Sequence, residues 1–202
     1  MSTGEYYFDS QVSGSVSFSK LIELMKNPPT KLKTLVDAIR TESIKEKRDE
    51  MKTHLPGFMV QSISDGKRRS YEHLVKFTGY TVLDFDGEYV KSIAKELKQF
   101  LFDNYSFVVA SFISPSGKVK CIIRMEEAKS VGEYQDYYRA VIAHFSQYEG
   151  FDESYKNGVQ IMFYTYDPDL LYRDDATKWT WKEEKPVPTP SSVNTIKYDS
   201  SF

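Results

Sequence analysis

The sequence predicts an α+β protein in which a mostly antiparallel sheet is backed by helices. Helical and strand-like patterns interleave along its 202 residues, which are enough to bury a real core. Two short apolar runs, 107–113 and 119–125, are separated only by the turn-forming residues 114–118. That pattern indicates a β-hairpin, whose two strands pair antiparallel.

The first 55 residues are predicted to be mainly helical. Strands or a hairpin are expected within 1–18, around 6–8 and 14–18, and Ser19 is the expected cap of the first helix. That helix should end before a pair of prolines at 28 and 29. The next helix carries apolar residues at helical spacing, namely Leu32, Leu35, Val36 and Ile39. The charged segment 41–53 predicts a further, largely solvated helix.

The remaining elements follow from the same periodicities. We expect a strand near 58, a polar turn over 64–69 with a helix-like approach after it, and then, in order, a strand at 79–85, a helix at 90–102, the hairpin, a helix at 130–145 and a strand at 159–166. The 130–145 helix should turn its apolar stripe inward, which consists of Tyr134, Tyr138, Val141 and Phe145. From 185 the chain is rich in Pro, Ser and Thr, so 185–202 is predicted to be a linker or disordered tail after one domain, 1–184.

Composition excludes several classes of protein. The net charge is −2 and the pI about 6.0, so nucleic-acid binding would need local basic clusters around an acidic centre. The single cysteine, Cys121, excludes a disulfide framework and a cysteine zinc site, and it fits a reducing cytoplasm. Neither a signal peptide nor an apolar stretch of membrane-spanning length is visible, so we expect a cytoplasmic protein without a membrane partner.

Two acids stand at the end of the apolar run 79–85. Asp84 and Asp86 are two positions apart, so in a strand both side chains point to the same face. Two carboxylates on one face repel each other, and a hard cation such as Mg²⁺ or Mn²⁺ removes that repulsion while accepting their oxygens as ligands. The pair therefore predicts a divalent-metal site, against the plainer alternative of a polar strand end in solvent.

The turn after the next strand carries small and basic residues. Its hydroxyls, glycine and lysines are typical of a phosphate cradle, and they are Ser114, Ser116, Gly117, Lys118 and Lys120. Lys118 and Lys120 alternate with Val119, so both project to one face, and one of them could face the same site as the acid pair. The spacing of a Walker motif is absent, and an ordinary soluble hairpin turn is the alternative.

Further charged residues are weaker candidates. Asp152 could supply a third carboxylate to a two-metal site, with Asp167 as the second choice, although loop acids and Asp-Pro turns are common. The basic turn 67–69 and the segment 45–52 are candidate contacts to a nucleic-acid backbone. The three histidines show no metal-ligand spacing, and His144 fits a structural role on its helix.

The acid pair also permits a different chemistry. Asp84 to Gly87 resembles the first motif of haloacid-dehalogenase-type phosphatases, in which the first Asp is the nucleophile and the second a general acid. In that family a Thr usually follows the Gly, whereas here Glu88 does. Ser114, Lys118 and the pair at 174–175 would have to fill the remaining roles. About 80 residues precede a motif that usually opens its domain.

A set of ordered segments resembles the VirE N-terminal domain family, which belongs to the archaeo-eukaryotic primase (primase-polymerase) superfamily. That family occurs in bacterial mobile and phage-like replication genes, often fused or adjacent to a helicase. The resemblance runs from about residue 30 to residue 175, and the segments that carry it are 31–35, 39–40, 52–58, 77–86, 111–118 and 164–169.

The resemblance implies a primase-polymerase-like catalytic core over 1–184. It implies template-directed addition of nucleotides with Mg²⁺ or Mn²⁺ and (d)NTPs, on single-stranded DNA or a primer-template, with a possible helicase in cis or trans. The metal ligands would be Asp84, Asp86 and Asp152. Lys120 would contact nucleotide phosphate, together with Lys118 and Ser116.

The sequence departs from the family pattern at several points. The turn before Lys120 is one residue shorter than expected, Gln160 stands where related sequences tend to have Arg, and Arg173 where they tend to have Asn. The absence of an Arg at position 160 would weaken triphosphate binding. A catalytically degenerate nucleic-acid-binding or replication-initiator domain of a mobile element is therefore the alternative function.

Overall fold

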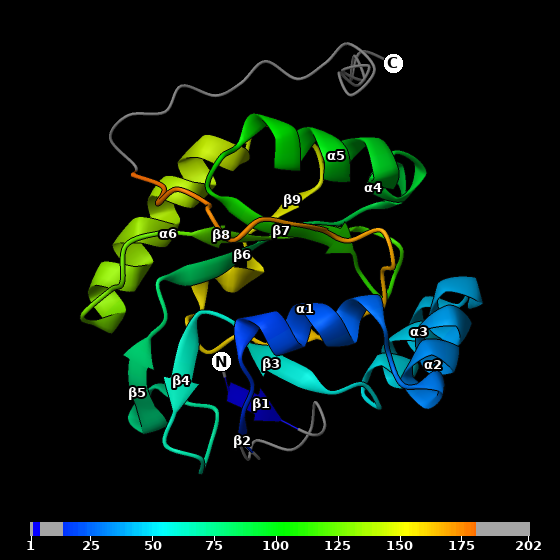
Figure 1. Ribbon diagram of the computed structural model, residues 1–202, viewed down its shortest axis with the longest axis horizontal. Helices are drawn as coiled ribbons and strands as arrows, with labels where there is room; N and C mark the ends of the chain where they lie inside the picture. Colours follow the sequence, from blue (N-terminus) through cyan, green and yellow to red (C-terminus); the bar gives the residue numbers. More distant parts are fainter. Residues whose placement is uncertain (1, 5–13, 181–202) are drawn as a thin grey trace, which may run out of the picture.

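The computed structural model describes residues 2–4 and 14–180, and these are built around a five-stranded antiparallel sheet (Figure 1). The strand order is β11-β7-β8-β6-β9. The strands are β6 (Tyr80–Phe85), β7 (Val108–Ile113), β8 (Val119–Arg124), β9 (Phe151–Asp152) and β11 (Leu171–Tyr172). Every pairing between these strands is antiparallel, which confirms the predicted α+β class and the β7–β8 hairpin.

Helices α4 (Glu88–Ser92), α5 (Ala94–Asn104) and α6 (Val131–Phe145) form a layer on one face of this sheet (Figure 1). The Ser111 hydroxyl donates to the Lys98 carbonyl of α5, and the ring of Phe85 packs edge-on against Phe145 of α6. Because these contacts use alternate residues of each strand, the other residues of the same strands face the opposite side.

The second face is covered by the first three helices and by two smaller sheets. Helix α1 (Phe18–Lys26) lies below the central sheet in Figure 1, and α2 (Thr30–Thr41) and α3 (Lys45–Lys52) lie beside it. One small sheet has the order β10-β3-β1-β2, with β1 (Ser2–Gly4), β2 (Gly14–Ser15), β3 (Gly57–Met59) and β10 (Met162–Phe163). The other pairs β4 (Ser62–Ser64) with β5 (Leu74–Phe77), and 3₁₀ turns occur at η1 (Tyr71–His73) and η2 (Ser154–Lys156).

Several predicted elements are confirmed with small shifts. The four apolar residues predicted for the 130–145 helix are all buried, α2 buries Val36 and Ile39, and the charged α3 buries none of its own residues within the described chain. His144 lies in an aromatic cluster with Tyr105 and Trp179, as a structural residue would. The first helix is capped by Ser17, whose hydroxyl accepts from the Lys20 amide at 3.2 Å, and the predicted cap Ser19 lies inside it.

Other predicted elements differ from the structure. The expected helix at 90–102 is two helices that meet at Ile93, and the helix-like segment after the polar turn is a single 3₁₀ turn before β5. The long strand expected at 159–166 is wrong, because only Met162–Phe163 pairs with a neighbour. Its apolar residues are buried by irregular packing instead; the Tyr164 amide, for example, donates to the Pro56 carbonyl at 2.7 Å. The strand expected around 6–8 and the tail 185–202 lie outside the described residues.

The longest helix of the described residues, α6, has 15 residues. No helix in the ranges 2–4 and 14–180 combines the length and the apolar character that crossing a bilayer requires.

Asp167 is a buried residue paired with Lys98, and its role as the second choice for a third metal ligand stays a prediction. Its carboxylate lies 3.1 Å from the Lys98 ammonium of α5, and both side chains are almost fully buried. The same carboxylate accepts a hydrogen bond from the Ile113 amide at 2.8 Å. Asp167 therefore fixes the end of β7, immediately before the turn at 114–118.

Replacing Asp167 should destabilise the fold strongly. Asp167→Ala leaves the buried Lys98 ammonium without its carboxylate partner and with only the Asp169 carbonyl at 2.8 Å, so we expect a loss of about 3–5 kcal/mol in the free energy of unfolding, measured by urea denaturation. The matched control is Glu23→Ala, which breaks the exposed ion pair with Lys20 and should cost about 0–1 kcal/mol. Equal losses for the two variants would contradict a structural role for the buried pair.

Candidate functional site

The register of three strands places Lys120, Asp84 and Asp152 in one row across the central sheet. Asp84 of β6 stands opposite Lys120 of β8 on one side and opposite Asp152 of β9 on the other. Residues directly opposite one another in antiparallel strands project to the same face. The row therefore lies on the face away from α5 and α6, between the central sheet and the segments below it.

Asp84 is the deepest acid of this row. Its carboxylate pairs with the Lys120 ammonium, and the two side chains are only 16% and 12% exposed. Burial raises the pKa of Asp84; the attraction of Lys120 opposes that rise, and repulsion from Asp86 and Asp152 adds to it. The Lys120 ammonium also lies 5.1 Å from the ring centre of Tyr155, so aromatic and acidic groups both surround this cation.

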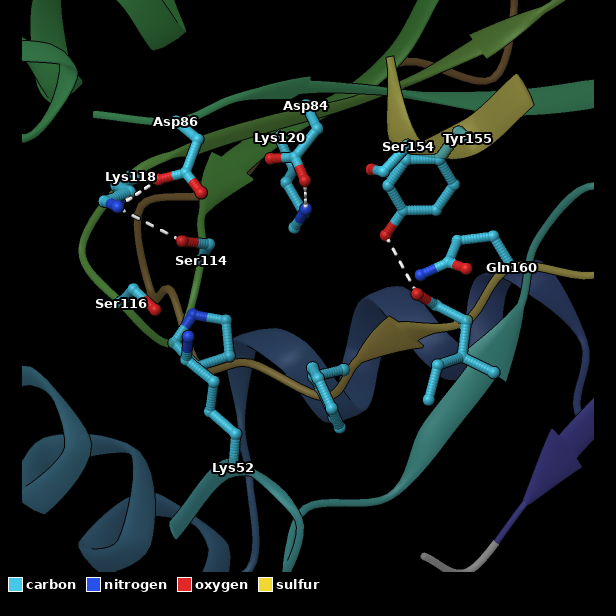
Figure 2. Close-up of a pocket in the computed structure, with 13 residues that line it drawn as sticks. Lys52, Asp84, Asp86, Ser114, Ser116, Lys118, Lys120, Ser154, Tyr155 and Gln160 are labelled. Carbon is cyan, nitrogen blue, oxygen red and sulfur yellow. Dashed lines mark hydrogen bonds and ion pairs between the residues drawn. The ribbon is translucent and has the colours of Figure 1, made fainter. Parts of the chain in front are cut away.

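Asp86 lies just beyond the end of β6 and is more open, with its side chain 55% exposed. Its amide donates to the Gly150 carbonyl at 2.6 Å, and one carboxylate oxygen accepts from the Gly87 amide at 2.8 Å and pairs with the Lys118 ammonium (Figure 2). Partial burial alone would raise the pKa of Asp86, but the hydrogen bonds from Lys118 and Gly87 outweigh it and lower that pKa. The pKa of Asp84 is thus raised and the pKa of the neighbouring Asp86 lowered.

The turn 114–118 and the start of β8 bring both Lys118 and Lys120 to the acids, where the sequence predicted that one of them could reach the site. The turn is closed by its own hydrogen bonds: the Ser114 amide donates to the Lys118 carbonyl, the Gly117 amide to the Ser114 carbonyl, and the Lys118 amide to the Ser114 hydroxyl. Gly117 adopts a φ of +79°, which favours glycine. Because these three amides already donate inside the turn, the groups it offers to a phosphate are the lysine ammoniums and the Ser116 hydroxyl rather than a cradle of amides.

Arg40 of α2 supports this turn from below. Its guanidinium donates to the carbonyls of Ile113 and Ser114, both at 3.3 Å, and to the Tyr166 carbonyl at 2.6 Å. One planar group therefore ties the N-terminal helices to both the turn and the 165–167 segment.

These residues line a pocket of about 170 Å³ (Figure 2). Six of the predicted site residues line it, namely Asp84, Asp86, Ser114, Ser116, Lys118 and Lys120. Gly117 shapes the turn without lining the pocket. Asp152 neighbours Asp84 in the sheet, but its carboxylate accepts from the Ser154 amide at 2.7 Å and it is not a lining residue.

The opposite wall contains residues that the sequence did not single out as site residues. They come from α3, from η2 and from the segment after it, and they are Lys52, Ser154, Tyr155, Gln160, Ile161 and Phe163. Figure 2 shows Lys52 pointing toward the turn from below and Gln160 on the far side from Lys118. The sequence marks Gln160 only as a departure from the pattern of the resembled family, and it marks Lys52 only as the end of the segment 45–52, a candidate contact to a nucleic-acid backbone.

The donor set suits a small, hard divalent ion. Asp84 and Asp86 supply carboxylate oxygens, the donors that Mg²⁺ and Mn²⁺ prefer. In the described part of the chain, however, no three or more His, Cys, Asp or Glu side chains are gathered closely enough to hold a metal ion. Asp152 as the third ligand stays a prediction, and the remaining ligands of an ion at Asp84 and Asp86 would have to be water or substrate oxygens.

Fold and pocket define a class of α+β domain with an acidic and basic pocket between an antiparallel sheet and the segments that cover its second face. The chain belongs to the family described as BT4734-like, N-terminal domain, whose model matches residues 50–172. No curated protein and no solved structure gives a significant match to the chain. The matched range contains both acids and both lysines of the pocket.

Gly150 provides a direct test of how Asp86 is positioned. A Cβ at Gly150, where φ is +80°, would overlap the Asp86 carbonyl oxygen and the Val90 side chain, so Gly150→Ala should displace Asp86 as well as strain the backbone. The matched control is Gly66→Ala, which has φ of +89° and open space around it. We expect about 1–2 kcal/mol of destabilisation for the control from its φ alone.

Gly150→Ala should lose about 1–3 kcal/mol more than the control, because overlap with the backbone adds to the same conformational strain. Urea denaturation of both variants measures the difference. Similar losses in the two variants would show that the contact between Gly150 and Asp86 is looser than the structure has it.

Proposed function

We propose that this chain is a primase-polymerase-type domain that transfers nucleotides, with Mg²⁺ or Mn²⁺, to a nucleic-acid primer or de novo on single-stranded DNA. The observation that carries the proposal is that Asp84 and Asp86 share one pocket with Lys118 and Lys120. In the resemblance to the VirE N-terminal domain family, these positions correspond to the acidic metal motif and to the basic phosphate contact. We infer that the BT4734-like family is a relative of those domains.

The pocket has the groups that nucleotidyl transfer needs. A bound divalent ion would lower the pKa of an attacking hydroxyl and neutralise charge on the phosphates. Asp84 and Asp86 would hold that ion against the sheet. Lys118 and Lys120 would attract the triphosphate, and the buried Ser116 would hydrogen-bond one of its oxygens.

A catalytically degenerate nucleic-acid-binding domain is the second candidate. The observation that favours it is Gln160, which lines the pocket where related sequences tend to carry Arg. A neutral amide lacks the charge and the planar donor fork with which Arg grips phosphate. This candidate keeps template binding and loses turnover.

A phosphatase with Asp84 as nucleophile has less support. That chemistry would recruit Asp174 and Asp175 as a second acidic pair, but neither of them lines the pocket that contains Asp84. The Asp84 carboxylate also forms an ion pair with Lys120, and both side chains are largely buried.

An incorporation assay separates these functions. The full chain with Mn²⁺, labelled NTPs or dNTPs and a single-stranded template should extend or synthesise nucleic acid, and a chelator should abolish the product. Asp84→Asn should lower the rate of incorporation about 10²-fold or more, because it removes a carboxylate ligand of the metal ion that stabilises the charge of the transition state. Glu23→Gln, at an exposed position of α1, is the control and should keep the rate of the parent chain.

Other outcomes of the same assay decide against the proposal. Template binding without incorporation, unchanged by Asp84→Asn, would favour the degenerate domain. Release of phosphate from an aryl phosphate, with an acyl-phosphate formed on Asp84, would show that the chain is a phosphohydrolase.

A further inference from the structure

We propose that Lys118 and Lys120 are exchangeable counter-ions, so that the pocket admits a divalent ion together with a nucleoside triphosphate and binds the free ion poorly. In the absence of nucleotide the two ammoniums neutralise the acids. When the metal–triphosphate complex binds, the ion takes the carboxylates and the phosphates take the lysines. This inference rests on the proposed function and specifies the form in which its substrate binds.

Charge balance is the first argument. Asp86 pairs with Lys118 and Asp84 with Lys120, so each carboxylate of the metal-binding pair has its own cation. A free divalent ion entering this pocket would meet two ammoniums at close range, and its attraction to the acids would be largely cancelled. A metal–triphosphate complex carries negative charge overall and meets no such barrier.

Ligand number is the second argument. The described residues offer no group of three or more acidic, His or Cys side chains that could hold an ion by themselves. Mg²⁺ is typically held by one or two carboxylates with substrate phosphates and water completing its shell. Two acids without a third fixed ligand match that arrangement, in which the triphosphate belongs to the coordination sphere.

Geometry makes the exchange feasible. Both ammoniums sit on flexible four-carbon stems that can turn from a carboxylate to a nearby phosphate without moving the backbone. Asp86 is half exposed at the pocket mouth, so its pair with Lys118 is the accessible one, whereas the pair of Asp84 and Lys120 lies deeper. Ser116 lies in the same turn as Lys118, and Figure 2 shows Lys52 pointing toward this turn from below.

Calorimetric titration of the full chain with MnCl₂ alone tests the exchange. Lys118→Met frees Asp86, which is exposed enough to stay ionised, so we expect free Mn²⁺ to bind about tenfold more tightly or better. The matched control is Lys52→Met, which removes the same charge from the pocket wall; because Lys52 pairs with Asp49 and not with the site acids, its effect should stay within about twofold. Lys118→Gln repeats the test if the methionine variant folds poorly.

A second titration uses ATP, with and without Mn²⁺, as the probe of the complex. The parent chain should bind Mn²⁺–ATP more tightly than Mn²⁺ alone, and Lys118→Met should shrink or reverse that preference. Equal changes in free Mn²⁺ affinity for the two lysine variants, or tight binding of free Mn²⁺ by the parent chain, would overturn the inference.

The outcomes also separate this inference from the proposed function. Preference for Mn²⁺–ATP without any incorporation of nucleotides keeps the counter-ion exchange and contradicts turnover. Incorporation by a chain that binds free Mn²⁺ tightly keeps the function and contradicts the exchange. If neither Mn²⁺ nor Mn²⁺–ATP binds, both are wrong.

Discussion

The site depends on the register between β6 and its two neighbours. Asp84 faces Lys120 and Asp152 only because these three residues are paired across β8, β6 and β9. A slip of one residue in β8 would put Val119 or Cys121 opposite Asp84 and turn Lys120 into the layer of α5 and α6. Since both Val119 and Cys121 are fully buried in the core, the hydrophobic pattern of β8 excludes that slip. The same alternation that builds the core thus aims a lysine at the acid.

That register concentrates charge where the sheet would otherwise be apolar. Burial raises the pKa of Asp84, while hydrogen bonds lower the pKa of the more open Asp86. A carboxylate held ionised against its burial needs a nearby cation, and Lys120 supplies one. Sites that bind charged substrates commonly keep such locally unfavourable groups, which the rest of the fold must offset. The apolar packing of Phe85 with Phe145 and Phe151, on the opposite face of the same strands, serves that purpose.

How far the sequence could predict the site follows from the range of its signals. Alternation within one strand and a tight turn are local, so the residues alone put Asp84 and Asp86 on one face and allowed one of the two lysines to face them. The structure pairs each acid with its own lysine. The opposite wall could not, because Lys52 and Gln160 reach the pocket through contacts distant in the sequence. The strand predicted at 159–166 was wrong for a related reason. An apolar pattern indicates burial, and most of this segment is buried without strand pairing. Asp167 shows a further limit, because an acid in the sequence gives no sign of whether its partner is a metal ion or a lysine such as Lys98.

The pocket also depends on residues outside the family match. The match begins at residue 50, yet Arg40 of α2 donates to the carbonyls of Ile113 and Ser114 and so fixes the start of the turn 114–118. Helix α1 contributes as well, since the Met25 carbonyl accepts from the Asp167 amide at 3.0 Å. Asp167 in turn holds the Ile113 amide, so the last residue of β7 is gripped through both its amide and its carbonyl. The turn that presents Lys118 is therefore anchored at its root by the first two helices, and the N-terminal segment is part of the frame of the site.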